Sequence, residues 1–290
     1  MGFYDLLIGP FVEFGFMRRA LAGCLVLASG AAPIGVFLML RRMSLIGDAM
    51  AHAILPGAAA GYLLAGFSLG AMTVGGLVAG FAVAVLAGIV ARTTTLKEDA
   101  ALAGFYILSL AAGVTLLSAR GSNVDVLRVL FGSVLALDDP TLWLMLAVTT
   151  ITLISLSALF RGLVLDSVDP GFFASVSRSA AALPLVFLGI VVINLVSAFH
   201  ALGTLLAVGI LILPAASARL WSNDLTRMIA LAWAFATLAS LVGLIASYHF
   251  GLASGPTIIL AAGMIYVLSL AFGRTGGIVR TVQPSQHLKG

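Results

Sequence analysis

The chain has 290 residues, of which 61% are hydrophobic and only 9% carry a charge. Soluble domains carry a charge on about 25% of their residues, so this composition excludes an ordinary soluble domain and indicates a polytopic membrane protein. A net charge of +4 would suggest nucleic acid as the partner of a soluble chain. Here the basic residues lie mostly between apolar spans, where they set the topology, and no nucleic-acid partner is expected.

Apolar spans occupy most of the chain. Residues 1–17 form a short aromatic segment, broken by Pro10, which we expect to lie in the membrane interface. The spans after it are predicted at about 20–40, 44–67, 69–91, 100–119, 142–160, 180–199, 202–220, 228–248 and 257–272. Because the boundary between residues 199 and 203 is indistinct, the sequence predicts eight or nine transmembrane helices. The expected fold class is an all-α polytopic membrane protein, with residues 1–290 as one helical-bundle domain.

The distribution of basic residues predicts the orientation of these spans. If Arg41 and Arg42 are cytoplasmic and the spans alternate, only four basic residues fall on the outer side: Arg18, Arg19, Arg120 and Arg128. The remaining 11 of the 15 lysines and arginines are then cytoplasmic. This is the positive-inside bias of membrane proteins, and the reverse topology would violate it.

Three segments outside the predicted spans have distinct patterns. Residues 121–139 alternate charged and apolar positions, as an amphipathic helix in the outer interface does. Residues 165–178 are predicted to lie on the cytoplasmic side, and residues 274–290 form a cytoplasmic tail in the nine-span topology.

The cytoplasmic segment at 165–178 contains the start signals of a short helix. Asp169 can cap the helix and Pro170 can begin it. Phe172, Phe173 and Val176 are then expected to share an exposed face. Exposed aromatic side chains on a short helix suit the anchors of a protein interface.

Asp48 and His52 are the candidate functional pair. If Arg42 marks the membrane surface, a helical rise of about 1.5 Å per residue places Asp48 roughly 9 Å and His52 roughly 15 Å deep. Asp48 is then the only deep acidic residue, and the two side chains share a helix face because they are four residues apart. A carboxylate and an imidazole can both bind a divalent transition metal. The alternative is a neutralising pair that only locks helix packing.

Two further histidines are candidates for an outer relay of a metal. His200 and His249 each lie 22 residues from a cytoplasmic arginine, Arg178 and Arg227. This separation corresponds to roughly 33 Å of helix, so both histidines are expected near the outer surface. The alternative is that each is an interfacial residue with a water partner.

The stretch SLIGDAMAHA at 44–53, followed by LPG at 55–57, resembles the signature of the zinc/manganese permease family of ABC transporters. Ala51 stands where the usual form has serine. Later stretches agree with the family: LFGS at 130–133, GTLL at 203–206, LPAA at 213–216 and SGPTI at 254–258. The resemblance extends from about residue 16 to residue 272, and the order and spacing of the motifs make it specific.

The resemblance implies the membrane-spanning permease subunit of an ATP-driven importer for a divalent transition metal, with zinc expected first and manganese second. It implies a second permease subunit, two separate cytoplasmic ATPase subunits and an extracytoplasmic metal-binding protein, in a prokaryotic inner membrane. We expect a homodimer, although the sequence does not distinguish an identical from a different partner permease. The family places its ATPase-coupling helix at 165–178, although Gly171 stands where an acidic residue is common. The metal is then cargo, no cofactor is permanently bound, and ATP acts on the partner subunit.

The sequence lacks the motifs of two enzyme classes. Neither Lys97 nor Lys289 follows a glycine, so there is no Gly-Lys-Ser/Thr phosphate-binding loop, and the chain is not expected to be an enzyme. There is also no His-Glu-x-x-His pattern, which argues against an intramembrane metalloprotease. The main rival hypothesis is a secondary transporter driven by an ion gradient, in which Asp48 is the protonation site.

Overall fold

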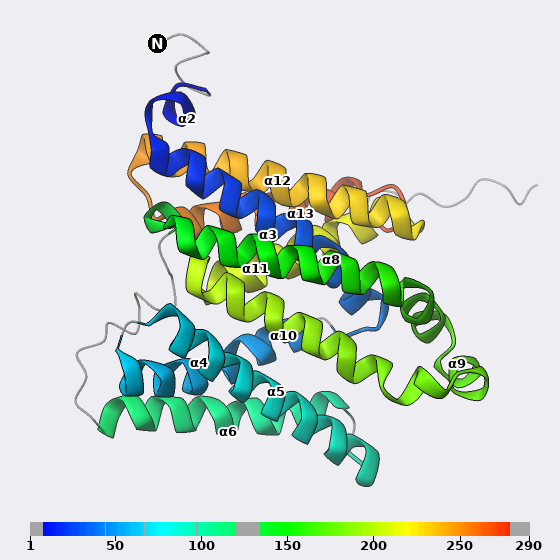
Figure 1. The fold of residues 1–290 in the computed structure, drawn as a ribbon. Coiled ribbons are helices and arrows are strands. Elements are labelled where there is room, and N and C mark those ends of the chain that lie inside the picture. The colour runs from blue at the N-terminus through cyan, green and yellow to red at the C-terminus, as the bar shows by residue number, and fades with distance from the viewer. Residues whose placement is uncertain (1–7, 44, 67, 97, 120–133, 279–290) are drawn as a thin grey trace, which may run out of the picture.

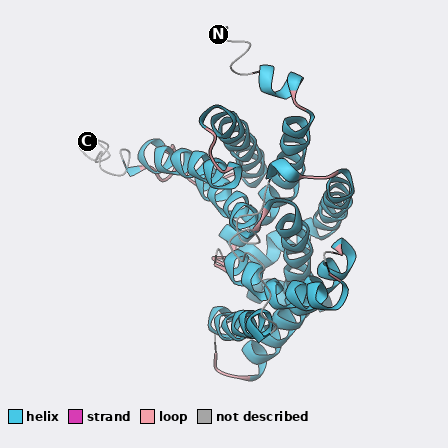
Figure 2. Ribbon diagram, turned by 90° about the vertical axis from the view of Figure 1, so that its left-hand side faces the viewer, coloured by secondary structure: helices cyan, strands magenta, loops and turns pink. Residues whose placement is uncertain are grey.

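The computed structural model describes residues 8–43, 45–66, 68–96, 98–119 and 134–278, and these ranges contain helices and no strand (Figure 2). The expected all-α fold is confirmed. The long helices are α3 (Gly15–Leu40), α4 (Ile46–Ala65), α5 (Leu69–Thr93), α6 (Glu98–Ala119), α8 (Asp139–Val168), α10 (Leu183–Leu202), α11 (Thr204–Arg219), α12 (Leu225–Phe250) and α13 (Ser254–Phe272). The short elements are α2 (Gly9–Glu13), η1 (Val134–Ala136), α9 (Pro170–Val176) and η2 (Arg178–Ala181).

Five of the described helices are long and apolar enough to cross a membrane: α3, α5, α8, α12 and α13. Shorter apolar stretches occupy Ala100–Thr115, Leu183–Phe199 and Thr204–Arg219. Helix α4 falls in neither group, because it combines Asp48 and His52 with many small residues. Gly203, at φ 86°, separates α10 from α11 at the boundary that the sequence left indistinct. The count of eight or nine crossings stays a prediction.

The helices form two packed groups (Figure 1). Helices α4, α5 and α6 pack on one another, and α3, α11, α12 and α13 form the second group. Helix α10 joins the groups through contacts with α4, α5, α8 and α11. Helix α4 therefore has α6 on one side and α11 on the other, which positions the candidate pair between the two groups.

Successive long helices run in opposite directions along the bundle (Figure 1). The end that carries α9 also holds the turns after α3, α5 and α11, and we call it the inner end after the predicted orientation. The opposite, outer end holds the turns after α4, α10 and α12. Which end of the bundle faces the cytoplasm stays a prediction.

Arg42 makes the turn between α3 and α4 at the inner end. Its φ is 58°, in the left-handed region that non-glycine residues rarely adopt. The N–H of Met43 donates to the carbonyl of Leu38 at 2.9 Å, and that of Arg42 donates to Met39 at 3.2 Å. These two bonds are the Schellman pattern that ends many helices, so the last carbonyls of α3 are satisfied as the chain turns into α4.

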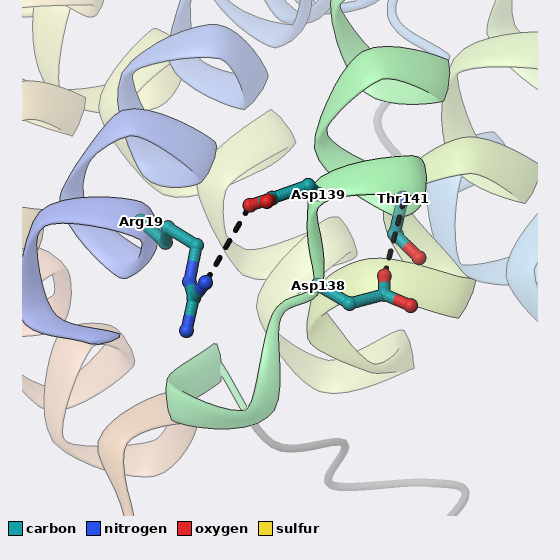
Figure 3. A network of polar contacts seen from close by, with 4 residues as sticks. All are labelled: Arg19, Asp138, Asp139 and Thr141. Atoms are coloured by element: carbon teal, nitrogen blue, oxygen red, sulfur yellow. Dashed lines mark hydrogen bonds and ion pairs between the residues drawn. The ribbon is translucent and has the colours of Figure 1, made fainter. Parts of the chain in front are cut away.

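A capped helix start joins α8 to α3 at the outer end (Figure 3). Asp138 accepts a hydrogen bond from the Thr141 N–H at 3.1 Å, and Asp139 forms an ion pair with Arg19 at 3.5 Å. Hydrogen bonding from the Thr141 side chain, with a smaller contribution from its backbone N–H, holds the pKa of the Asp138 carboxyl below its ordinary value. Both aspartates thus belong to the start of α8. The rest of the amphipathic segment expected at 121–139 lies outside the described residues, except for Val134–Leu137.

The two ends of the chain are described in part. Of the segment expected in the interface, residues 1–7 lie outside the described ranges, and α3 begins as early as Gly15. Of the predicted cytoplasmic tail, residues 279–290 lie outside them. Thr275 bonds to the carbonyls of Leu220 and Arg219, so the beginning of the tail packs on the end of α11.

Candidate functional site

Asp48 and His52 lie on one face of α4, as the four-residue spacing predicts. Asp48 is in the first turn of the helix, and its Oδ1 is 3.6 Å from Nε2 of His52. The Asp48 side chain is 56% exposed in the single chain and that of His52 is 30% exposed. The pair is therefore accessible to an ion that approaches along this face.

A cavity of about 340 Å³ opens beside the pair, between α4, α11 and α13. Its lining includes Asp48, Ala51 and His52 on α4, Thr204, Leu205, Val208 and Gly209 on α11, and Ile259 on α13. Gly209 lies ten residues before the inner end of α11 at Arg219, a distance of about 15 Å along the helix. On α11 the cavity therefore lies away from the inner end, whereas on α4 it begins at the first helical turn, at Asp48.

Gly47 allows α4 to approach α11 closely at this site. A Cβ added there would lie 2.9 Å from Cδ2 of Leu211, closer than ordinary packing permits. The glycine before Asp48 therefore has a packing role.

Pro56 changes the backbone of α4 next to the pair. It has no N–H to donate to the carbonyl of His52, its partner in a regular helix. One residue further on, Ser109 of α6 donates to the carbonyl of Ala53 at 3.0 Å. The carbonyl oxygen of His52 thus lacks its usual i+4 donor, within the same turn as the two side chains.

The other two predicted histidines lie near helix ends on the outer side. His200 is two residues from the end of α10, and His249 is in the last turn of α12, with its ring 5.2 Å from that of Tyr248. His249 does not line the cavity at Asp48. In the part of the chain that the structure describes, no group of three or more His, Cys, Asp or Glu side chains could hold a metal ion. The outer relay stays a prediction.

The predicted short helix on the inner side is present as α9, and one of its expected features is wrong. Oδ1 of Asp169 accepts the N–H of Phe172 at 2.9 Å, and Pro170 is the first helical residue. Phe172 and Val176 are 54% and 61% exposed, but Phe173 is only 4% exposed. Neighbouring residues point about 100° apart on a helix, so Phe173 turns inward. Its ring packs beside Gly162 of α8 and anchors α9.

The sequence analysis missed a buried ion pair near α9. It ended the fifth span at residue 160, whereas α8 continues to Val168. Asp166 therefore lies inside a helix, 9% exposed, in an ion pair with Arg41 at the end of α3. Oδ2 of Asp166 makes this charge contact without a well-directed hydrogen bond. The guanidinium carbon of Arg41 also lies 5.3 Å from the ring centroid of Phe187 on α10.

Tyr106 of α6 is a second neighbour of the candidate pair that the sequence analysis missed. Its ring is stacked on that of His52, with centroids 6.1 Å apart and an interplanar angle of 26°. Aromatic residues are common in apolar helices, so no pattern in the sequence distinguishes Tyr106 from other aromatic side chains.

Comparison with known proteins gives consistent matches over most of the chain. Residues 13–273 match the model of the ABC 3 transport family. The chain is 33% identical to the "Manganese transport system membrane protein MntC" of Listeria innocua, over 94% of this chain and 96% of that protein. It is 34% identical to the "Manganese import system permease protein ScaB" of Streptococcus gordonii, over 89% and 91%. Among solved structures, "PsaBC from Streptococcus pneumoniae in complex with Fab" matches with a TM-score of 0.83 and 29% identity, over 96% and 99% of the two chains.

Proposed function

The chain belongs to the ABC 3 transport family, and on that premise we propose that it is the membrane-spanning permease subunit of an ATP-driven importer of a divalent transition metal. The observation that carries this proposal is the Asp48–His52 pair on the wall of an accessible cavity between α4, α11 and α13. A carboxylate in an apolar environment is costly and marks an ion path by default. Two ligands on one helix turn form an incomplete site, which suits release as well as binding.

We propose manganese as the cargo. The sequence motifs favoured zinc before manganese, but the relatives reported above carry manganese in their names. The donor set supports the same choice, because carboxylate, carbonyl and water oxygens suit manganese. The Asp48 carboxylate and the carbonyl of His52, which lacks its usual i+4 donor, supply such oxygens, and the imidazole adds one nitrogen.

The remaining parts of the importer are proposed from the resemblance and from α9. They are a second, identical permease subunit, two cytoplasmic ATPase subunits and an extracytoplasmic metal-binding protein, in a prokaryotic inner membrane. Phe172 and Val176 lie four residues apart and both are exposed, so they form the face of α9 that is proposed to dock on the ATPase. Asp169 and Pro170 start this helix, and Phe173 holds it against α8.

The test measures manganese uptake into vesicles that contain the permease with its ATPase, supplied with saturating metal-loaded binding protein. Asp48→Asn removes the charge without changing the shape, and His52→Ala removes the nitrogen ligand. Each variant is expected to lower uptake by at least about tenfold, the effect of about 1.4 kcal/mol on a barrier. Basal ATP hydrolysis and assembly are expected to survive.

Ala51→Ser is the matched control, because it changes the same helix turn to the residue usual in the family and adds no charge. Its uptake is expected to stay within about twofold of the parent, less than 0.5 kcal/mol on a barrier. Near-normal uptake in both Asp48→Asn and His52→Ala would make these residues a packing pair. Uptake that proceeds equally without ATP would favour a secondary transporter.

A further inference from the structure

The Arg41–Asp166 ion pair lies at the inner end, between α9 and the turn that leads into α4. Asp166 is in the last turn of α8, and Asp169, three residues later, caps α9. On the other side of the pair, Arg41 ends α3 and Arg42 makes the turn into α4. The two chain segments that meet in this pair therefore continue into α9 in one direction and toward Asp48 in the other.

Arg41 contacts both of the long helices through which α9 is attached to the bundle. Helix α9 packs against α8 and η2, and η2 packs against α10. Arg41 pairs with Asp166 of α8, and its guanidinium carbon lies 5.3 Å from the ring centroid of Phe187 on α10. The two charged side chains are each only 10% exposed, so solvent and salt screen their attraction weakly. A displacement of α9 that moves α8 or α10 therefore acts on Arg41.

Stability alone does not account for this pair. An acidic residue in the last turn of a helix is unfavourable, because that end of the helix carries a partial negative charge. Burying two charges is also costly, and an apolar pair of similar volume is often as stable. Oδ2 of Asp166 is buried without a well-directed hydrogen bond, so this cost is not fully offset. Residues that break local rules in this way are expected at functional sites.

The turn that follows Arg41 is itself in a costly conformation. A φ of 58° at Arg42 is rare for a residue with a side chain, and such a conformation persists only where the surrounding structure holds it. Asp48 is the third residue of α4, the helix that this turn leads into. A change in the position of Arg41 therefore alters the turn and, with it, the start of the helix that carries Asp48.

We infer that the Arg41–Asp166 pair transmits a displacement of α9 to α4, so that the nucleotide state of the ATPase sets the position of Asp48. This role rests on the proposed function, in which α9 docks on the ATPase. Both are positioning residues, and neither lines the cavity beside Asp48 and His52. An ion pair fixes the distance and direction between its partners, whereas apolar contacts are non-directional. Two apolar side chains therefore keep α3 and α8 packed but allow one to slide along the other.

The test measures Mn²⁺ ions imported per ATP hydrolysed, in vesicles that contain permease and ATPase and are supplied with loaded binding protein. Arg41→Met with Asp166→Leu is expected to lower this ratio by at least about tenfold, within the 5–150-fold range of coupling between sites. ATPase binding and basal ATP hydrolysis are expected to stay unchanged. Arg41→Gln with Asp166→Asn also removes both charges and is expected to give the same loss, which covers failure of the apolar variant to assemble.

Two further variants separate coupling from other effects of substitution. Arg41→Lys keeps the charge, so it is expected to lower the ratio by less than about fivefold, the lower limit of such coupling. Asp139→Asn removes the acidic partner of the exposed pair at the outer end, and it is expected to leave the ratio unchanged.

Spin labels on introduced cysteines locate the interruption. Cys24 is the only cysteine and is 2% exposed, so exposed cysteines can be labelled selectively. Val168 ends α8 beside α9 and is 79% exposed, and Leu45 directly precedes α4 and is 76% exposed. In the parent, trapping the ATPase with ATP and vanadate is expected to change the label signal at both positions. In the two double variants, only the label at Val168 is expected to respond.

The link is refuted if the assembled double variants import as many ions per ATP as the parent, or if the label at Leu45 still responds in them. It is also refuted if neither label responds in the parent, if Arg41→Lys loses as much as the double variants, or if Asp139→Asn does. Failure of the parent complex to import Mn²⁺ with ATP and binding protein would instead overturn the proposed function.

Discussion

Removing Asp166 tests how much the buried ion pair at the inner end contributes to stability. The side chains of Arg41 and Asp166 are each only 10% exposed, and the pair joins the ends of α3 and α8. Asp166→Asn leaves the Arg41 guanidinium without its counter-charge in a poorly solvated position. Losing one partner of a buried pair typically costs about 3–5 kcal/mol. Because this pair lies near a helix end and keeps some solvent contact, we expect Asp166→Asn to lower the free energy of unfolding by the smallest value in this range, about 3 kcal/mol.

The contact with Phe187 moderates this cost without removing it. A guanidinium over an aromatic ring contributes about 0.5–2 kcal/mol, and the ring stays when Asp166 is changed. Replacing both charges, as in Arg41→Met with Asp166→Leu, is expected to recover most of the loss, since a well-packed apolar pair is often as stable as an ion pair. The double-mutant cycle built from Arg41→Met, Asp166→Leu and their combination should therefore give a coupling energy of about 2 kcal/mol, within the range for residues in contact.

The assay is equilibrium unfolding of the purified permease in mixed micelles by a denaturing detergent. The exposed pair at the outer end provides the control (Figure 3). Arg19 and Asp139 are 46% and 69% exposed and 3.5 Å apart, so Asp139→Asn is expected to cost less than about 1 kcal/mol. The reasoning is refuted if Asp166→Asn and Asp139→Asn lower the free energy of unfolding equally. It is refuted as well if the double variant is no more stable than the sum of the single losses predicts.

Two further predictions follow from the packing of α4 and α9. A Cβ added at Gly57 would lie 2.0 Å from the carbonyl oxygen of Gly75, so Gly57→Ala is expected to separate α4 from α5 and cost at least about 2 kcal/mol of unfolding free energy. Gly104→Ala has open space around it and should be neutral or stabilising in the same assay. Phe173→Ala is expected to cost about 3 kcal/mol because the ring is buried, whereas Phe172→Ala should leave stability unchanged and lower metal uptake and ATPase binding. Equal stability losses for both phenylalanines, or full uptake in Phe172→Ala, would contradict the assignment of the α9 face.

Much of the helix pattern follows from the sequence, because apolar runs and capping residues are local signals. The cap at Asp169 and the proline after it correctly predict where α9 begins. The shared face of Asp48 and His52 also follows from spacing alone. The end of α8 could not be predicted from the sequence, because polar residues such as Asp166 are typical of a loop. Asp166 lies inside the helix because Arg41, from α3, balances its charge.

Side-chain contacts between one helix and another could not be predicted. The burial of Phe173 depends on the direction in which α9 packs against α8, which the α9 sequence does not contain. The stacking of Tyr106 on His52 depends on how α6 lies against α4. Both arrangements depend on how one helix packs against another, and local periodicity carries no information about that packing.

The contrast between the two helical aspartates indicates which one can serve a cation. Asp166 is buried and paired with a permanently charged guanidinium, so it attracts a further cation only weakly. Asp48 is accessible, and within the described residues its neighbour at ion-pair distance is the imidazole of His52, which is itself a metal ligand when neutral. An incoming dication can therefore be the main counter-charge of Asp48, whereas at Asp166 it would have to displace Arg41. The same chain thus uses one carboxylate to hold its helices together and leaves the other available at a cavity wall.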